Sequence, residues 1–262
     1  LGRKMSKSLG NSPDPLDLIA NFGADAVRTG MLFSSPAGND LLYDEKLIEQ
    51  GRNFANKIWN AFRLVKGWNV SKDLTAPDEC VVARNWFESK FNQSLEVLED
   101  HFAKFRMSDA LHQVYKLIWD DYCSWYLEMV KPEFGKPIDE STYTQTISFF
   151  EKILKVLHPF MPFITEALWQ KLPIRSGETI MLRRSPQGDA AWIKPDVNQA
   201  VDFVLESVRA IRNLRQQYGV AFQTAVPIVI ESPDETERQA LESSRDLITH
   251  FVRISDLTII PA

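Results

Sequence analysis

The segment that decides the fold is residues 52–66, RNFANKIWNAFRLVK, in which apolar side chains recur every three or four positions. Because a helix advances about 100° per residue, the apolar residues fall on one side: Phe54, Ile58, Ala61, Phe62 and Val65. The opposite side carries polar and basic residues, namely Arg52, Asn56, Asn60, Arg63 and Lys66, with Trp59 close by. The pattern predicts an amphipathic helix with one face in a core and one cationic face in water.

From residue 46 to residue 175 the same helical spacing keeps returning. Ser108 is a good N-cap, and Pro132 stops the apolar pattern that follows it. Pro159 and Pro162 force another break. Amphipathic helices joined by short links predict a bundle, with further helices over 87–102, 108–131, 142–157 and 163–172.

The flanking regions, 1–45 and 176–262, have a different pattern of apolar, glycine and proline residues. Glycine and proline punctuate the first, where Asp14 is predicted to cap a helix starting at Pro15 and a second short helix follows Gly23. The second is predicted to hold strands at 179–182, 225–230 and 257–260 and helices at 197–218 and 235–251. The predicted fold is mainly α: a helical bundle preceded by a short α/β remnant and followed by a small α+β tail.

Composition bounds the class of protein. The chain has 262 residues, of which 44% are hydrophobic, so it is long enough to bury a core. It has no apolar run of about 18 residues and no signal-like start, so we expect a cytoplasmic protein with no membrane partner. A net charge of −5 argues against a basic DNA coat, and we expect no DNA partner, although a local basic face can still bind RNA. The start at Leu1, without Met, suggests a piece of a longer protein.

The two cysteines suggest neither a disulfide nor a metal site. Cys80 and Cys123 lack a CxxC partner and a histidine at ligand spacing. We expect both to be packing residues, and we expect no metal site.

The most specific motif is residues 4–11, KMSKSLGN. Two lysines spaced by three and interleaved with hydroxyl groups form a cationic loop suited to polyphosphate, because positioned cations stabilise charge on phosphoryl oxygens. The string resembles the KMSKS signature of class I aminoacyl-tRNA synthetases. The resemblance implies that the loop binds ATP, used with Mg²⁺ in the whole enzyme, and that Lys7, with Lys4, is catalytic; the loop residues are Lys4, Met5, Ser6, Lys7 and Ser8.

The other half of that family's ATP site does not occur in the chain. It is a His-Ile-Gly-His signature, and none of the four histidines is followed by Gly and then His at that spacing. We therefore expect this polypeptide to be part of an ATP-dependent ligase and to be inactive alone.

Within the class, several strings resemble the valyl enzymes: RNFANKIWNA at 52–61, IWDDYCSWY at 118–126, LHPFMPFITE at 157–166 and AIRNLR at 210–215. The resemblance implies an anticodon-binding helical bundle, with tRNA(Val), valine and ATP as partners of the whole enzyme. Amino-acid selection and editing would lie upstream. Two alternatives remain open: part of an isoleucyl or leucyl enzyme, and a helical scaffold that binds proteins and no RNA.

The cationic helix is the predicted tRNA contact, because Arg and Lys bind phosphate and an aromatic ring can stack an unpaired base. The candidates are Arg52, Asn56, Lys57, Trp59, Asn60, Arg63 and Lys66. Other groups are expected to be structural. These are the arginines at 209, 212 and 215, the aromatic residues at 119, 122, 125 and 126, and His158, Glu133 and Glu166.

Overall fold

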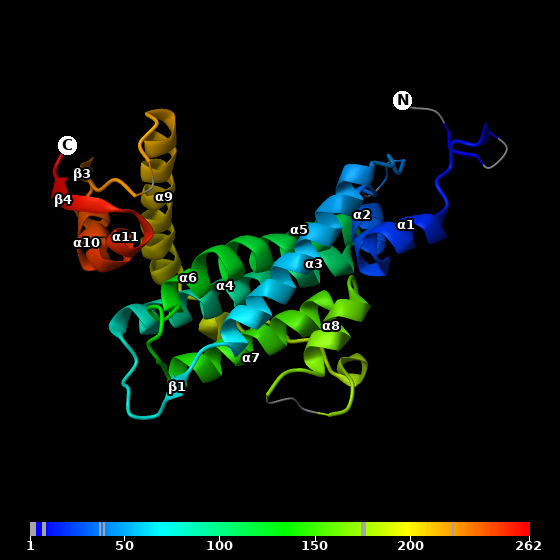
Figure 1. Cartoon of the computed structure of the whole chain (residues 1–262), viewed down its shortest axis with the longest axis horizontal. Helices are drawn as coiled ribbons and strands as arrows, with labels where there is room; N and C mark the ends of the chain where they lie inside the picture. Colours follow the sequence, from blue (N-terminus) through cyan, green and yellow to red (C-terminus); the bar gives the residue numbers. More distant parts are fainter. Residues whose placement is uncertain (1–3, 7–8, 37, 39, 174–176, 222) are drawn as a thin grey trace.

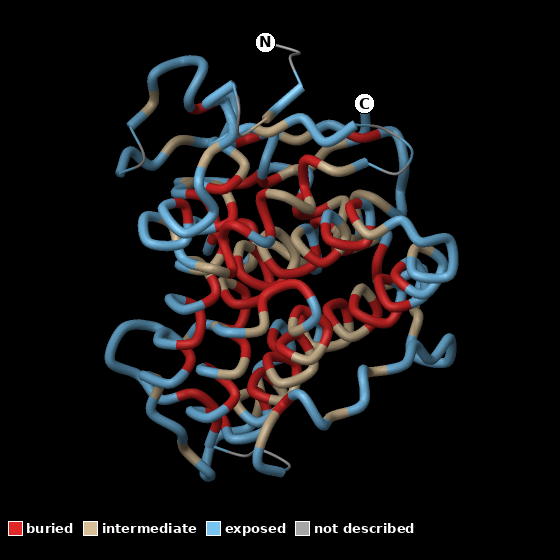
Figure 2. The backbone as a smooth tube through the Cα atoms, turned by 90° about the vertical axis from the view of Figure 1, so that its right-hand side faces the viewer, coloured by how far each residue is buried: buried red, intermediate tan, exposed pale blue. Residues whose placement is uncertain are grey.

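Long helices with buried apolar faces form the centre of the molecule (Figure 1). The computed structural model describes residues 4–6, 9–36, 38, 40–173, 177–221 and 223–262. The central helices are α3 (Glu45–Lys66), α4 (Asp78–Ala103), α5 (Met107–Lys116) and α7 (Glu140–Leu157), with the shorter α8 (Pro162–Trp169) after the proline break. Figure 2 shows the buried residues running through the middle of the molecule and the exposed residues on its loops. The predicted mainly helical fold is confirmed.

The predicted apolar stripe of α3 is buried along its whole length. Phe54 and Ile58 have no exposed surface, and the remaining stripe residues are also buried. Phe62 packs its ring against Phe150 of α7, with centroids 5.8 Å apart. The stripe thus joins α3 to the bundle and fixes which face of the helix meets water.

The helix predicted from Ser108 is one continuous rod with an unusual centre. It begins at Met107, and Ser108 is buried inside it instead of capping it. Its three parts are α5, the π-helical η2 (Leu117–Tyr126) and α6 (Leu127–Val130). The wider π turn lets the Ser124 hydroxyl donate to a carbonyl five residues earlier, at Trp119 (2.7 Å).

The aromatic residues of η2 belong to the core, as expected. Tyr122 and Tyr126 are fully buried and stack with centroids 5.5 Å apart. Their hydroxyls find partners on Thr146, whose carbonyl accepts from Tyr122 (3.1 Å) and whose hydroxyl bonds Tyr126 (2.8 Å). Satisfied hydroxyls let tyrosine occupy a core position without an unpaired polar group.

Both cysteines are buried and free, which confirms their expected packing role. Burial raises the pKa of the Cys80 thiol to about 11 and that of Cys123 to about 12. Thiols held so firmly in the protonated form are poor nucleophiles.

The N-terminal stretch forms α1 (Pro15–Phe22) and α2 (Ala24–Phe33). Asp14 caps α1 as predicted, accepting a hydrogen bond from the Leu16 N–H (2.8 Å). The residues of 1–45 that the structure describes contain no strand, so the α/β character expected there is not seen. The strands in the described chain lie at residues 70–71, 138–139, 226–231 and 254–260.

Helix α2 crosses α3 at two glycines. A Cβ atom built on Gly30 would lie 2.6 Å from the Cα atom of Ile48, and one on Gly51 would lie 2.7 Å from the carbonyl oxygen of Ala26. Real carbon contacts are longer than this, so only glycine permits so close a crossing.

The C-terminal region contains the predicted small α+β unit. Strands β3 (Val226–Glu231) and β4 (Ile254–Ile260) pair in parallel, and the chain between them forms two helices. Helix α9 links this unit to the bundle, and η4 is a short turn before it. The bounds are α9 (Pro195–Gln217), α10 (Glu235–Ser243), α11 (Arg245–Phe251) and η4 (Ala190–Trp192).

The strand predicted at 179–182 is wrong, because this segment is the 3-10 turn η3 (Ile180–Leu182). The Glu166 carboxylate accepts hydrogen bonds from the Thr179 hydroxyl (2.7 Å) and the Ile180 N–H (3.1 Å), which holds the turn closed. A short parallel pairing not foreseen from the sequence joins β1 (Val70–Ser71) to β2 (Ile138–Asp139). None of the helices in the described parts of the chain is long and apolar enough to span a membrane.

Candidate nucleic-acid interface

The predicted nucleotide loop is described at Lys4, Met5 and Ser6, whereas Lys7 and Ser8 lie outside the described residues. Asn11 closes this segment: its side-chain oxygen accepts from the Ser6 N–H (2.8 Å), and its amide donates to the Lys4 carbonyl (3.3 Å). Lys4 is exposed. Its ammonium group and the Ser6 hydroxyl are donors of the kind that phosphate oxygens accept. The sequence alone assigned Asn11 no role of its own within residues 4–11.

Two charged residues of α2 fasten the N-terminal helices to the bundle. The Asp25 carboxylate accepts hydrogen bonds from the backbone N–H groups of Phe163 (3.2 Å) and Ile164 (2.7 Å) in the first turn of α8. Arg28 donates to the carbonyls of Pro159 (3.1 Å) and Phe160 (3.3 Å). These bonds satisfy groups that a helix end and a proline break leave without partners.

Neither role was foreseen from the sequence. The available signal was the charged pair Asp25 and Arg28 in a helix otherwise rich in small and apolar residues, ADAVRTGMLF. Asp25 is only 8% exposed, and burial raises the pKa of its carboxyl against the hydrogen bonds from Ile164 and Phe163 that lower it.

The polar side of α3 forms an exposed strip, which we call the α3 ridge. It runs from the N-terminal helices toward β1 across the front of the bundle in Figure 1. The structure brings together on it the predicted residues Arg52, Asn56, Trp59, Asn60, Arg63 and Lys66, each of them exposed. No acidic residue occurs between Arg52 and Lys66. The ridge is therefore a cationic surface with one large aromatic ring, Trp59, which is 36% exposed.

Two of the predicted basic residues, Lys57 and Arg52, also contact other side chains of the chain. Lys57 is half-buried, with its ammonium group 5.3 Å above the Trp119 ring, so it lies beside the ridge more than on it. Arg52 lies 3.7 Å from the Glu49 carboxylate and 5.5 Å above the Phe22 ring. An exposed ion pair of this length contributes little and exchanges readily for another anion.

The arginines of α9 are structural, as expected. Arg215 is buried and donates to the carbonyls of Arg253 (2.9 Å), Ala221 (2.8 Å) and Thr224 (2.7 Å). Arg209 and Arg212 lie over the Trp125 ring, at 5.0 Å and 5.6 Å. These groups hold the C-terminal unit on the bundle.

His158 and Glu166 have structural partners. The His158 ring Nδ1 bonds the Thr165 hydroxyl (2.7 Å), and Glu166 holds the η3 turn described above. These contacts give both residues the structural role expected from the sequence.

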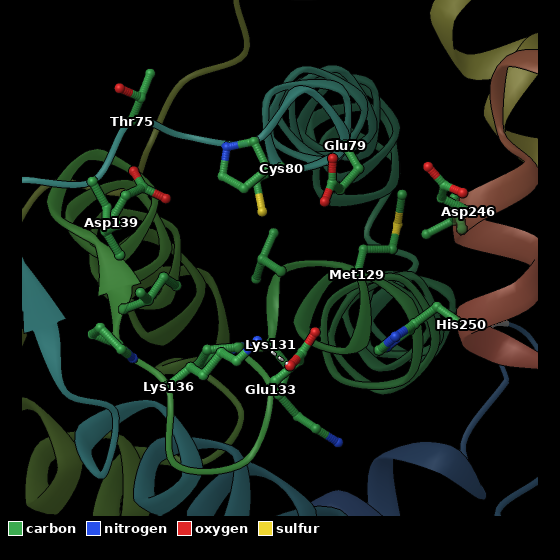
Figure 3. Close-up of a pocket in the computed structure, with 17 residues that line it drawn as sticks. Thr75, Glu79, Cys80, Met129, Lys131, Glu133, Lys136, Asp139, Asp246 and His250 are labelled. Atoms are coloured by element: carbon green, nitrogen blue, oxygen red, sulfur yellow. Dashed lines mark ion pairs between the residues drawn. The ribbon is translucent and has the colours of Figure 1, made fainter.

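A cavity of about 400 Å³ opens at the far end of the bundle, between β2 and α11 (Figure 3). Cys80 and Met129 lie at its centre, while Asp139 lies on one side and Asp246 and His250 on the other. Acids outnumber bases in its lining: Glu79, Glu133, Asp139 and Asp246 against Lys131, Lys136 and His250. It is thus poorly suited to phosphate. Within the described residues, no group of acidic, His and Cys side chains is placed to hold a metal ion.

Comparison with known proteins gives two family matches. Residues 84–230 match the family described as anticodon-binding domain of tRNA ligase, and residues 1–44 match tRNA synthetases class I (I, L, M and V). Helix α3 lies between the two matched regions.

Curated relatives are similar over most of this chain. A valine–tRNA ligase of Porphyromonas gingivalis is 55% identical over 223 residues, covering 85% of the chain and 25% of the relative. The enzyme of Christiangramia forsetii is 46% identical over 90% of the chain and 27% of the relative. That of Fusobacterium nucleatum is 38% identical over 98% of the chain and 30% of the relative. The chain therefore spans about a quarter of the length of the curated relatives it matches.

A solved structure shares the fold. The LeuRS of Agrobacterium radiobacter K84, in a ternary complex with tRNA and LeuAMS, has a TM-score of 0.53 and 21% identity, covering 74% of this chain and 23% of that one. This similarity concerns the fold alone. Because the anticodon-binding match covers more than half of the chain, the chain belongs to the family of tRNA-ligase anticodon-binding domains.

Proposed function

We propose that this chain is the C-terminal part of a valine–tRNA ligase and that it holds the anticodon arm of tRNA(Val) on the α3 ridge. The observation that carries the proposal is the exposed strip of α3 over residues 52–66, with basic residues and no acid, on a chain of the anticodon-binding family. The names of its relatives supply the valine assignment.

Arg63 and Lys66 are the central phosphate contacts of the proposal. Both are exposed in the last turns of α3, where they also oppose the negative end of the helix dipole. A phosphate bound there would meet two cations about one turn apart. Asn56 and Asn60 lie beside them on the same strip and can donate hydrogen bonds to phosphate or ribose oxygens.

In the whole ligase, Lys7 and Lys4 would bind the ATP phosphates together with Mg²⁺. ATP supplies the adenylyl group that activates the valine carboxylate. We propose that this chain contributes the cations of the 4–8 segment, and that residues 1–45, 46–175 and 176–262 form its three functional parts in a cytoplasmic enzyme.

The proposal is tested by filter-binding titration of this chain with a tRNA(Val) transcript over a range of salt concentrations. We expect affinity that falls with salt, since each phosphate contact contributes about 0.7 to 0.9 to the logarithmic salt slope. The double variant Arg63→Glu and Lys66→Glu should bind at least about tenfold more weakly and with a shallower slope.

A matched control changes the same total charge elsewhere. Arg184→Glu with Lys171→Glu alters two exposed basic residues outside α3 and should leave affinity nearly unchanged. Equal loss in both double variants would show that overall charge, and not the ridge, binds the RNA. No affinity in the unaltered chain would favour the protein-binding scaffold, and preference for isoleucine or leucine anticodons would end the valine assignment.

A further inference from the structure

The loop between α6 and β2 holds a phenylalanine entirely in solvent. Phe134 is 108% exposed relative to its reference state, at the tip of residues 131–137, KPEFGKP. The Lys136 N–H donates to the Glu133 carbonyl (2.9 Å), which closes a tight turn with Phe134 and Gly135 at its centre. Gly135 sits at φ +80°, a conformation that side chains rarely adopt. Prolines at both ends of the loop stiffen it further, so a defined turn presents this ring to water.

This loop is joined to the chain that leaves the α3 ridge. The Ile138 N–H, just after the loop, donates to the Asn69 carbonyl (2.8 Å), and Ile138 pairs with Val70. Asn69 follows the end of α3 at Lys66 by three residues. The base of the loop therefore lies beside the chain that continues from the Lys66 end of the α3 ridge.

The charges of the loop are balanced, which limits what it can recognise. Lys131 pairs with Glu128 (2.9 Å) and Lys136 with Glu133 (2.6 Å). The neighbouring cavity has more acids than bases. Phosphate would gain little here, whereas the face of an aromatic ring attracts any unpaired base regardless of sequence.

We propose that Phe134 is a stacking platform for an unpaired base of the RNA held on the α3 ridge. The inference rests on the proposed function and extends the binding surface beyond α3. A protein partner fits less well, because a stable protein interface needs a continuous apolar area, whereas Glu133 and Gly135 flank this ring.

The first test compares Phe134→Ala and Phe134→Trp with the unaltered chain in titrations against an anticodon stem-loop RNA. We expect the Ala variant to bind about 5- to 100-fold more weakly, the range expected for loss of one base stack, with an unchanged salt slope. The Trp variant should keep or improve the affinity. Phe105→Ala is the matched control: Phe105 is also highly exposed (82%) but lies at the turn after α4.

The second test locates the base. Single abasic nucleotides are placed in turn through the loop of the RNA, and Phe134→Ala is measured against each. At the stacked position the variant and the unaltered chain should bind equally, because the abasic site has already removed the interaction.

The inference is wrong if Phe134→Ala binds the RNA as tightly as the unaltered chain, if it changes the salt slope, or if Phe105→Ala weakens binding as much. The last result would point to a general effect of exposed rings. These outcomes leave the proposed function intact, provided that the unaltered chain binds RNA with salt dependence. If the unaltered chain does not bind, the proposed function itself fails.

Discussion

Replacement of Asp25 by alanine tests how the N-terminal helices are fastened to the bundle. The change removes two hydrogen bonds to the first turn of α8, at Phe163 and Ile164, and leaves both N–H groups without that acceptor. Loss of a capping acceptor costs about 0.5 to 2 kcal/mol, and a buried donor without a partner costs about 1 to 3 kcal/mol. Part of this is offset, because burial of the carboxylate is itself unfavourable.

We therefore expect Asp25→Ala to lower the free energy of unfolding by about 2 kcal/mol, which corresponds to about 4 to 8 °C in melting temperature for a chain of this size. Urea and thermal unfolding followed by circular dichroism give both quantities. Asp17→Ala, which removes an exposed acid of α1, is the control and should change stability by less than about 0.5 kcal/mol. A loss at Asp25 no larger than that of the control would refute the role assigned to these bonds.

Three further predictions concern other parts of the chain. Gly30→Ala should destabilise by about 1 to 3 kcal/mol in urea unfolding, because its Cβ would meet the Ile48 backbone, whereas Gly67→Ala should be nearly neutral. Burial raises the pKa of Asp121 to about 6 from 3.8, so the folded chain binds this proton more tightly than the unfolded chain. The free energy of unfolding that the protonated carboxyl contributes is then lost as the pH rises from about 4 to about 6. Because asparagine does not ionise, Asp121→Asn should become more stable relative to the unaltered chain between about pH 4 and about pH 7, as measured by urea denaturation at each pH. Arg215→Leu leaves three carbonyls without their donor, so limited proteolysis should cleave the C-terminal unit faster while the bundle resists.

The features that the sequence predicted correctly depend on residues close together along the chain. The period of apolar residues in 52–66 depends only on helix geometry, so it predicted both the buried stripe of α3 and the exposed ridge. The Asp14 cap was predictable for the same reason, since the bond spans two residues. Helix content and the exposed face of α3 could therefore be obtained without knowing the tertiary structure.

What the sequence could not predict depends on distant partners. The η3 turn replaces a strand because Glu166 binds it from 13 residues away. Asp25 takes its role from α8, 138 residues further along the chain. In the candidate site, Lys57 lies about 120° from Arg63 around the helix. Only the structure shows that its ammonium group lies over the Trp119 ring of a distant helix.

The two-glycine crossing fixes the position of α2 along α3. A shift of one helix along the other would bring a residue with a side chain to the crossing, where a Cβ atom on Gly30 or Gly51 would lie within 2.7 Å of the opposite helix. The distance from Gly30 in α2 to Arg63 in α3 is therefore held by this crossing while both helices are intact. Two glycines at positive φ precede α2 in the described chain, Gly10 (φ +62°) and Gly23 (φ +90°). The distance between Lys4 and the α3 ridge can change at these positions without altering the crossing.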